Sequence, residues 1–196
     1  MKKSRPSFDF NTQSPLFDAF ERKAVSLDLR EGAPVFYPDQ MQDSLYFVKK
    51  GVMRSYIRHN DIEVTRWFYS AGDLAYSALS VFHGLPSDIC LVAACPSIVM
   101  QIYKEDYCKL CDGFPEFRQT INDLQGSFLY RYAHYNDSAR TLLRIERYRK
   151  FLDEFPLVGG QVQIRHQASF LGMTPDTLSK IRKQFQNKAS QRMTLT

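Results

Sequence analysis

Residues 163–183 have the sequence QIRHQASFLGMTPDTLSKIRK, with apolar positions at the spacing of two short helices joined by a tight turn. Ala168 is small where two helices must cross closely, and Gly172 suits a turn that needs a positive φ. The contacts between the two helices are expected from apolar side chains, namely Leu171, Met173, Leu178 and Ile181. The stretch therefore predicts a helix-turn-helix.

The second helix of this motif has a defined start and a polar outer face. Thr174 is a suitable N-cap, and Pro175 fits the first helical position, where its missing N–H costs nothing. The residues expected to face solvent are Asp176, Thr177, Lys180, Arg182, Lys183 and Gln184. Such a helix fits the major groove of duplex DNA. Gln167 stands where such motifs have an apolar residue, so the first helix either packs loosely or hydrogen-bonds through that amide.

The charge distribution favours a polyanionic partner for the same region. Residues 1–137 contain 15 Lys/Arg against 17 Asp/Glu, whereas residues 138–196 contain 11 against 4, so the net charge changes from −2 to +7. An excess of this kind is typical of nucleic-acid binding. The alternative is a basic tail that only keeps the protein soluble.

The region from about Val25 to Tyr103 predicts strands, because short runs rich in Val, Ile, Tyr and Phe alternate with turn residues. The clearest pair is 52–58 and 62–69, joined by residues 59–61. Glycines mark the expected corners: Gly32, Gly51, Gly72 and Gly84. Evenly spaced strands with glycine at the corners indicate a barrel or jelly roll, and a generic β-sandwich is the alternative.

After Pro115 the sequence predicts a long helix with one mostly apolar seam. The seam residues are Phe117, Ile121, Leu124, Phe128 and Tyr135. Arg131 interrupts them. The seam fits either a short coiled coil with a second copy, which we favour, or a helix laid on the β domain. Asp137 and Ser138 then predict the cap of another helix, over about 139–155.

This order of parts resembles the Crp/Fnr transcription regulators, and the resemblance covers about residues 17–186. It implies an α+β fold: a cyclic nucleotide-binding-like β-roll (a jelly roll, or double-stranded β-helix) as sensor domain over 1–113, a dimerisation helix over 114–137, and a helix-turn-helix DNA-binding domain over 138–196. It also implies a homodimer that binds a two-fold-symmetric site on double-stranded DNA.

The resemblance assigns residues to DNA contacts position by position. The family's base-contacting positions fall on Pro175, Asp176 and Lys180, and Pro175 cannot replace the family's arginine, which predicts a different operator. Base readout is expected from Asp176, Thr177 and Lys180, and phosphate contacts from Arg165, Thr174, Ser179, Arg182 and Lys183. No winged hairpin is expected after the motif, since only residues 187–196 follow.

The family holds its cyclic nucleotide with a Gly-Glu-Leu cassette and a later Arg-Ser or Arg-Thr pair. The corresponding residues here are Gly72-Asp73-Leu74 and Pro86-Ser87, so the arginine is missing, and no Lys or Arg occurs from Trp67 to Tyr103. A buried phosphate needs a compensating cation, so we predict no tight binding of cyclic AMP and no cofactor. A neutral or aromatic effector would have a pocket among Trp67, Tyr69, Gly72, Asp73, Leu74, Tyr76, Phe82 and Ser87, unless these side chains are simply core.

The cysteines and histidines predict no metal site. Cys108 and Cys111 form a C-x2-C pair, but Cys90 and Cys95 lie in an apolar run typical of core thiols. The oxygen-sensing branch of the family has its cluster cysteines near the N-terminus, whereas this chain has none before Cys90. A cupin-like metal enzyme is disfavoured because the four histidines are widely spaced: His59, His83, His134 and His166. No phosphate-binding loop or nucleophile motif indicates another enzyme.

The chain has no run of about 20 apolar residues and no apolar segment after its basic start, so we expect a cytoplasmic protein that does not enter a membrane. The leading hypothesis is a dimeric bacterial transcription regulator of unknown effector. RNA polymerase would be a partner if the protein activates transcription. The alternative is a β-roll module that binds a ligand or a protein and has no DNA-binding activity.

Overall fold

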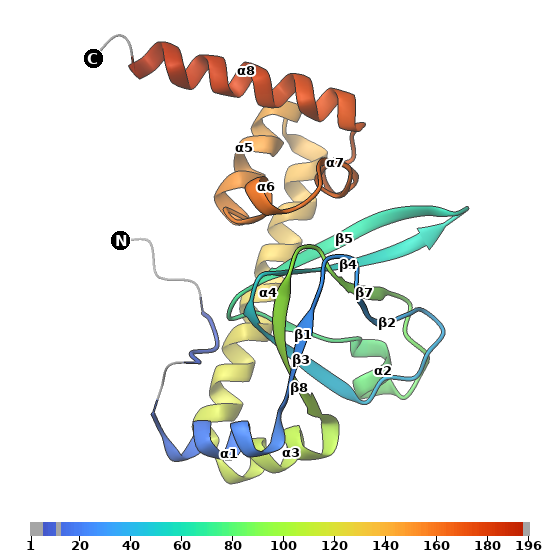
Figure 1. The fold of residues 1–196 in the computed structure, drawn as a ribbon, viewed down its shortest axis with the longest axis vertical. Coiled ribbons are helices and arrows are strands. Elements are labelled where there is room, and N and C mark those ends of the chain that lie inside the picture. The colour runs from blue at the N-terminus through green and yellow to red at the C-terminus, as the bar shows by residue number, and fades with distance from the viewer. Residues whose placement is uncertain (1–5, 11–12, 194–196) are drawn as a thin grey trace.

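A computed structural model describes residues 6–10 and 13–193, with side chains of the last helix as far as Phe185. Figure 1 shows a β-roll at one end of the molecule, a long helix along its side, and a group of helices at the other end. The expected succession of strand-rich and helical parts is therefore present.

The roll consists of two antiparallel four-stranded sheets, in the orders β1-β8-β3-β6 and β2-β7-β4-β5. The strands are β1 Val25–Leu29, β2 Pro34–Phe36, β3 Ser44–Lys50, β4 Val52–His59, β5 Ile62–Ser70, β6 Leu74–Ala75, β7 Cys90–Ala93 and β8 Ser97–Tyr103. Gly51 joins β3 to β4 with φ of 85°, and a Cβ there would lie 2.5 Å from the carbonyl oxygen of Pro96. This corner therefore requires glycine.

Short helices close the end of the roll farthest from the C-terminal helices (Figure 1). They are α1 Pro15–Lys23 and α3 Lys104–Gly113, while α2 Ala78–His83 lies between β6 and β7. Phe20 of α1 packs its ring 5.0 Å from that of Phe47 in β3, and both rings lie near Phe117 of the long helix. This cluster forms one of the two main cores of the chain.

The long helix α4, Pro115–Thr141, packs its apolar seam against its own chain. Phe117, Ile121 and Leu124 are buried in the core beside α1 and α3, and Phe128 and Tyr135 pack against Trp67 of β5. Of the two packings considered for the seam, the structure therefore shows the helix laid on the β domain. Phe117, Ile121, Leu124 and Tyr135 are buried in this packing and Phe128 is half-buried, so the structure does not support the dimer face predicted for these five residues.

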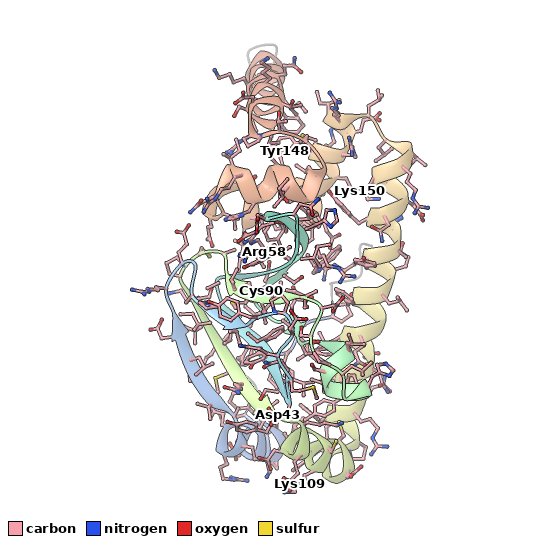
Figure 2. The ribbon with its side chains drawn as sticks, turned by 90° about the vertical axis from the view of Figure 1, so that its right-hand side faces the viewer. Asp43, Arg58, Cys90, Lys109, Tyr148 and Lys150 are labelled. Carbon is pink, nitrogen blue, oxygen red and sulfur yellow. The ribbon has the colours of Figure 1, made fainter. Side chains whose placement is uncertain are left out.

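The helix also ends later than predicted. Ser138 does not cap a new helix; its hydroxyl donates to the carbonyl of His134 at 2.7 Å and so continues α4. The next helix, α5 Arg144–Glu154, starts at Arg144 and not near Ala139. Lys150 of α5 reaches back to α4, where its Nζ donates to the His134 carbonyl at 3.2 Å and contacts the Ser138 hydroxyl (Figure 2).

Three further helices complete the C-terminal part: α6 Val158–Gln161, α7 Ile164–Leu171 and α8 Pro175–Met193. Helix α8 occupies the residues that follow the turn and extends to Met193, the last residue that the structure describes. Among the described residues, no helix combines the length and apolar character needed to cross a membrane.

Candidate nucleic-acid interface and ligand pocket

The predicted helix-turn-helix is present as α7, a turn and α8. Gly172 ends α7 in the left-handed region with φ of 64°, and the following N–H of Met173 donates to the carbonyl of Ala168 at 3.0 Å. Ala168 and Leu178 are fully buried where the two helices meet, with Leu171 beside them. The small residue, the glycine and the apolar positions thus have the roles that their spacing predicts.

Helix α8 begins as the sequence indicates. The Thr174 hydroxyl accepts a hydrogen bond from the Thr177 N–H at 3.2 Å, which is an N-cap interaction, and Pro175 is the first helical residue. Asp176 lies in the first turn, where a carboxylate interacts favourably with the helix dipole.

The buried amide of Gln167 replaces the apolar contact usual at its position. Its Nε2 donates to the carbonyls of Val158 at 3.1 Å and of Val162 at 2.6 Å. These carbonyls lie in α6 and directly after it. Gln167 therefore fastens α7 to α6 by hydrogen bonding, the second of the two alternatives that the sequence left open.

The residues predicted to contact DNA lie in two environments. Exposed to solvent are Arg165, Thr174, Asp176, Lys180 and Lys183, and half-buried are Thr177, Ser179 and Arg182. The Arg182 guanidinium donates to the Gly159 carbonyl at 3.4 Å, so part of its hydrogen-bonding capacity is used to hold α8 against α6. The individual base and phosphate contacts stay predictions.

Helix α7 is docked on the edge of the β-roll. The Ser169 hydroxyl accepts from the Thr65 N–H at 3.0 Å and donates to the Glu63 carbonyl at 3.1 Å. Because β5 is the outer strand of its sheet, these groups would otherwise have no strand partner. Burial, helped by Arg54 and Arg165, lowers the pKa of the neighbouring His166 to about 4, so this imidazole is neutral near pH 7.

Arg131, the charged residue within the apolar seam, joins three parts of the molecule. Its side chain is 9% exposed and pairs with Asp73 of the roll at 3.3 Å and with Glu154 of α5. The guanidinium also lies over the rings of Trp67, at 5.3 Å, and Phe155, at 5.7 Å.

Trp67 is the centre of an aromatic junction between roll and helices. Its buried ring meets Phe155, which directly follows α5, at 5.1 Å and Phe170 of α7 at 5.8 Å. On another side it meets three rings of α4, those of Phe128, Tyr132 and Tyr135. The roll, α4 and the helix-turn-helix thus share one core.

A cavity of about 510 Å³ opens between the roll, α2 and α4. Its lining residues are Ser55, Arg66, Trp67, Tyr69, Leu74, Tyr76, Ala78, Leu79, His83, Asp88, Ile89, Leu124, Gln125, Phe128, Leu129 and Tyr132. Four of the eight residues predicted for an effector pocket line it: Trp67, Tyr69, Leu74 and Tyr76.

The other four predicted pocket residues do not line this cavity: Gly72, Asp73 and Ser87 take part in local hydrogen bonds or ion pairs, and Phe82 lies at the surface. Gly72 exchanges backbone hydrogen bonds with Phe8 and Val48, and Asp73 accepts from the Ser70 N–H at 2.7 Å besides pairing with Arg131. The Ser87 hydroxyl is buried and donates to the Ile89 carbonyl at 2.9 Å. Phe82 is exposed at the surface, with its ring against that of Tyr76.

Sequence reasoning missed the charged pair of the cavity, in which the Arg66 guanidinium contacts the Asp88 carboxylate at 2.7 Å. Ser55 pairs with Trp67 and Tyr56 with Thr65, so Arg66 is the extra residue of a β-bulge. A bulge re-aims side chains relative to strict alternation, which a two-residue period does not reveal. The cation also precedes the Lys- and Arg-free segment by a single position.

The cysteines do not come together. Cys90 and Cys95 are buried in the roll, Cys108 is exposed and Cys111 is half-buried on α3, and all four are free thiols. Figure 2 shows Cys90 within the roll and Lys109, next to Cys108, at its far end. Among the described residues, no group of three or more His, Cys, Asp or Glu side chains is arranged to hold a metal ion.

A β-roll, a long connecting helix and a C-terminal helix-turn-helix are together the fold of the Crp/Fnr regulators, as the sequence resemblance implies. FixK2 from Bradyrhizobium japonicum is similar to this chain with a TM-score of 0.70 and 19% identity, over 85% of this chain and 86% of that one.

Two other solved structures show the same likeness. The c-di-GMP-responsive global regulator CLP from Xanthomonas campestris has a TM-score of 0.71 and 16% identity, over 90% of this chain and 93% of its own. A CooA mutant from Carboxydothermus hydrogenoformans has a TM-score of 0.70 and 17% identity, over 90% of this chain and 86% of its own. No family model and no curated protein matches by sequence. At these identities the comparison establishes the fold.

Proposed function

We propose that this protein is a dimeric, sequence-specific DNA-binding transcription regulator of bacterial type that acts in the cytoplasm. The observation that carries the proposal is the capped helix α8, which holds Asp176, Lys180 and Lys183 exposed on a scaffold whose fold is that of regulators. The surplus of 11 Lys/Arg over 4 Asp/Glu in residues 138–196 supports it. The division into sensor domain 1–113, dimerisation helix 114–137 and DNA-binding domain 138–196 belongs to the proposal.

The proposed contacts follow from exposure and chemistry. Asp176 accepts from a cytosine amino group and Lys180 donates to guanine, with Thr177 between them on the same helix. Contacts to phosphates come from Arg165, Thr174, Ser179 and Lys183, while Arg182 mainly positions α8 through the Gly159 carbonyl. Activation of transcription would add a contact with RNA polymerase, for which the described surface singles out no residue pattern.

Selection of bound duplexes from a random DNA pool tests this function. The wild-type protein is expected to enrich a two-fold-symmetric motif with an affinity that falls as salt rises. Lys180→Glu is expected to weaken binding to that motif by about 10-fold or more, because a base contact is worth about 1–3 kcal/mol.

Lys104→Glu is the matched control, since it makes the same charge change at the end of the roll far from α8. Absence of duplex binding at low salt would refute the proposed regulator function and favour the alternative, a β-roll module that binds a ligand or a protein. Equal losses in the two variants would show that α8 makes no specific contact.

The dimer face is proposed on the opposite side of α4 from the seam. Gly126, Tyr130 and Ala133 share one exposed face at helical spacing, and Tyr130 is 69% exposed. Leu129, which also lines the cavity, lies at the edge of this face. A second copy packed there would cover these apolar side chains and place two recognition helices side by side.

A double variant tests this face without touching the lining of the cavity. Tyr130→Glu with Ala133→Glu is expected to raise the dimer dissociation constant by about 100-fold, or roughly 2.7 kcal/mol, by burying like charges across the two-fold axis. Analytical ultracentrifugation measures the change. Leu143→Glu, at another exposed apolar position, is expected to leave the dimer intact, and a double variant that stays dimeric would place the interface elsewhere.

A further inference from the structure

We propose that the cavity between the roll and α4 binds a neutral, mainly aromatic small molecule and selects against anions such as cyclic nucleotides. The role of this molecule as an effector rests on the proposed function. Its chemical class depends only on the cavity, and it follows from the walls, the charges and the connections described next.

The walls are mostly apolar and come from both sides of the cavity. Aromatic rings are supplied by Trp67, Tyr69 and Tyr76 of the roll and by Phe128 and Tyr132 of α4. The rings of Tyr69 and Phe128 lie nearly parallel, with an interplanar angle of 12° and centroids 6.1 Å apart. A volume of 510 Å³ lies within the range of small-molecule sites, and flat aromatic ligands match walls of this kind.

The lining of the cavity offers an anion no unpaired lysine or arginine. Arg66 is the single Lys or Arg among the lining residues, and its guanidinium is held by Asp88 at 2.7 Å. These side chains are 39% and 55% exposed, so the pair lies toward the mouth of the cavity. An entering anion would have to displace the Asp88 carboxylate or remain beside it, and both cost free energy.

A few polar groups remain to orient a neutral ligand. The Gln125 amide donates to the Tyr76 hydroxyl at 3.0 Å across the gap between α4 and the roll. The Ser55 hydroxyl lies in the wall formed by β4. Uncharged donors and acceptors in an apolar cavity favour an uncharged partner with one or two polar atoms.

Binding in this cavity would reach the DNA-binding part directly. Trp67 lines the cavity and also contacts Phe155 and Phe170 of the C-terminal helices. A ligand that packs against this indole therefore acts on the same ring that docks the helix-turn-helix. Such a ligand shifts the equilibrium between the docked and the undocked helix-turn-helix by the difference between its affinities for these two arrangements.

Isothermal titration calorimetry of the full-length protein without DNA tests the ligand class. Naphthamide and naphthoate differ mainly in charge, and cyclic AMP is the third probe. Naphthamide is expected to bind about 10-fold tighter than naphthoate, with cyclic AMP weaker still. No binding of naphthamide, or equal or tighter binding of either anion, would overturn the proposal. Because no DNA is present, such a failure leaves the DNA-binding function standing, and loss of DNA binding would not explain it.

Two variants locate the site and its charge selectivity. Ala78 lines the cavity from an exposed position of α2, and Ala78→Phe is expected to fill the mouth and weaken naphthamide binding about 10-fold. Ala139 is also exposed but does not line the cavity, so Ala139→Phe is expected to leave naphthamide binding unchanged. Asp88→Asn frees Arg66 and is expected to strengthen naphthoate binding about 10-fold while naphthamide changes less than about 2-fold. Unchanged naphthoate binding in Asp88→Asn, or equal effects of the two phenylalanine variants, would contradict the proposal. Thermal melts confirm that each variant is folded.

Discussion

Replacing Phe155 by alanine is expected to lower the free energy of unfolding by about 3–5 kcal/mol. The ring is fully buried at the junction between β5 and the C-terminal helices. It lies 5.1 Å from the ring of Trp67, 5.8 Å from Phe68 and 5.4 Å from Phe170. Its removal opens a cavity whose walls belong to different parts of the chain, so partial collapse cannot restore the contacts.

Urea denaturation followed by circular dichroism measures this loss. Leu157→Ala is the control, because that leucine is 43% exposed and its truncation is expected to cost less than about 0.5 kcal/mol. A loss below about 1 kcal/mol in Phe155→Ala would mean that the helix-turn-helix is not docked on β5 in solution.

The second large effect is expected at Arg131. Arg131→Leu is predicted to destabilise the protein by about 3–5 kcal/mol, because it leaves two carboxylates without their shared cation. The side chain of Asp73 is 10% exposed and that of Glu154 28%, so water compensates for the loss only in part. The stacking of the guanidinium on Trp67 and Phe155 is lost as well.

A charge-free triple variant separates the ion pairs from packing. Arg131→Leu combined with Asp73→Asn and Glu154→Gln is expected to recover about half or more of the loss, since no buried charge is then left unpaired. Denaturation curves of the single and triple variants give the comparison. If Arg131→Leu alone costs nothing measurable, the network does not hold the roll, α4 and α5 together.

The helix-turn-helix was predictable because its determinants are local. Ala168, Gly172 and the Thr174-Pro175 pair each meet a requirement of the motif itself, and each has the predicted role. The β-roll was predictable for a similar reason, since strand runs and glycine corners follow one another along the chain.

The arrangement of these parts was not predictable in the same way. An apolar seam shows that α4 is covered but not by what, and the covering surface is its own roll. Arg131 looked like an interruption because its partners Asp73 and Glu154 are distant in sequence. Four of the eight residues predicted for an effector pocket line the cavity. Gly72 and Ser87 do not, because they take part in local hydrogen bonds, and a β-bulge brings Arg66 into the lining.

The position of Trp67 has a spectroscopic consequence. It is the only tryptophan of the chain, and its indole lies where the cavity, α4 and the helix-turn-helix meet. Hydration of an indole moves its emission to longer wavelength, so undocking of the C-terminal helices would move the signal in that direction, and a ligand that packs against the indole would change its surroundings as well. The molecule thus contains its own fluorescent reporter at the joint between its two ends, and both events are observable in the unlabelled protein.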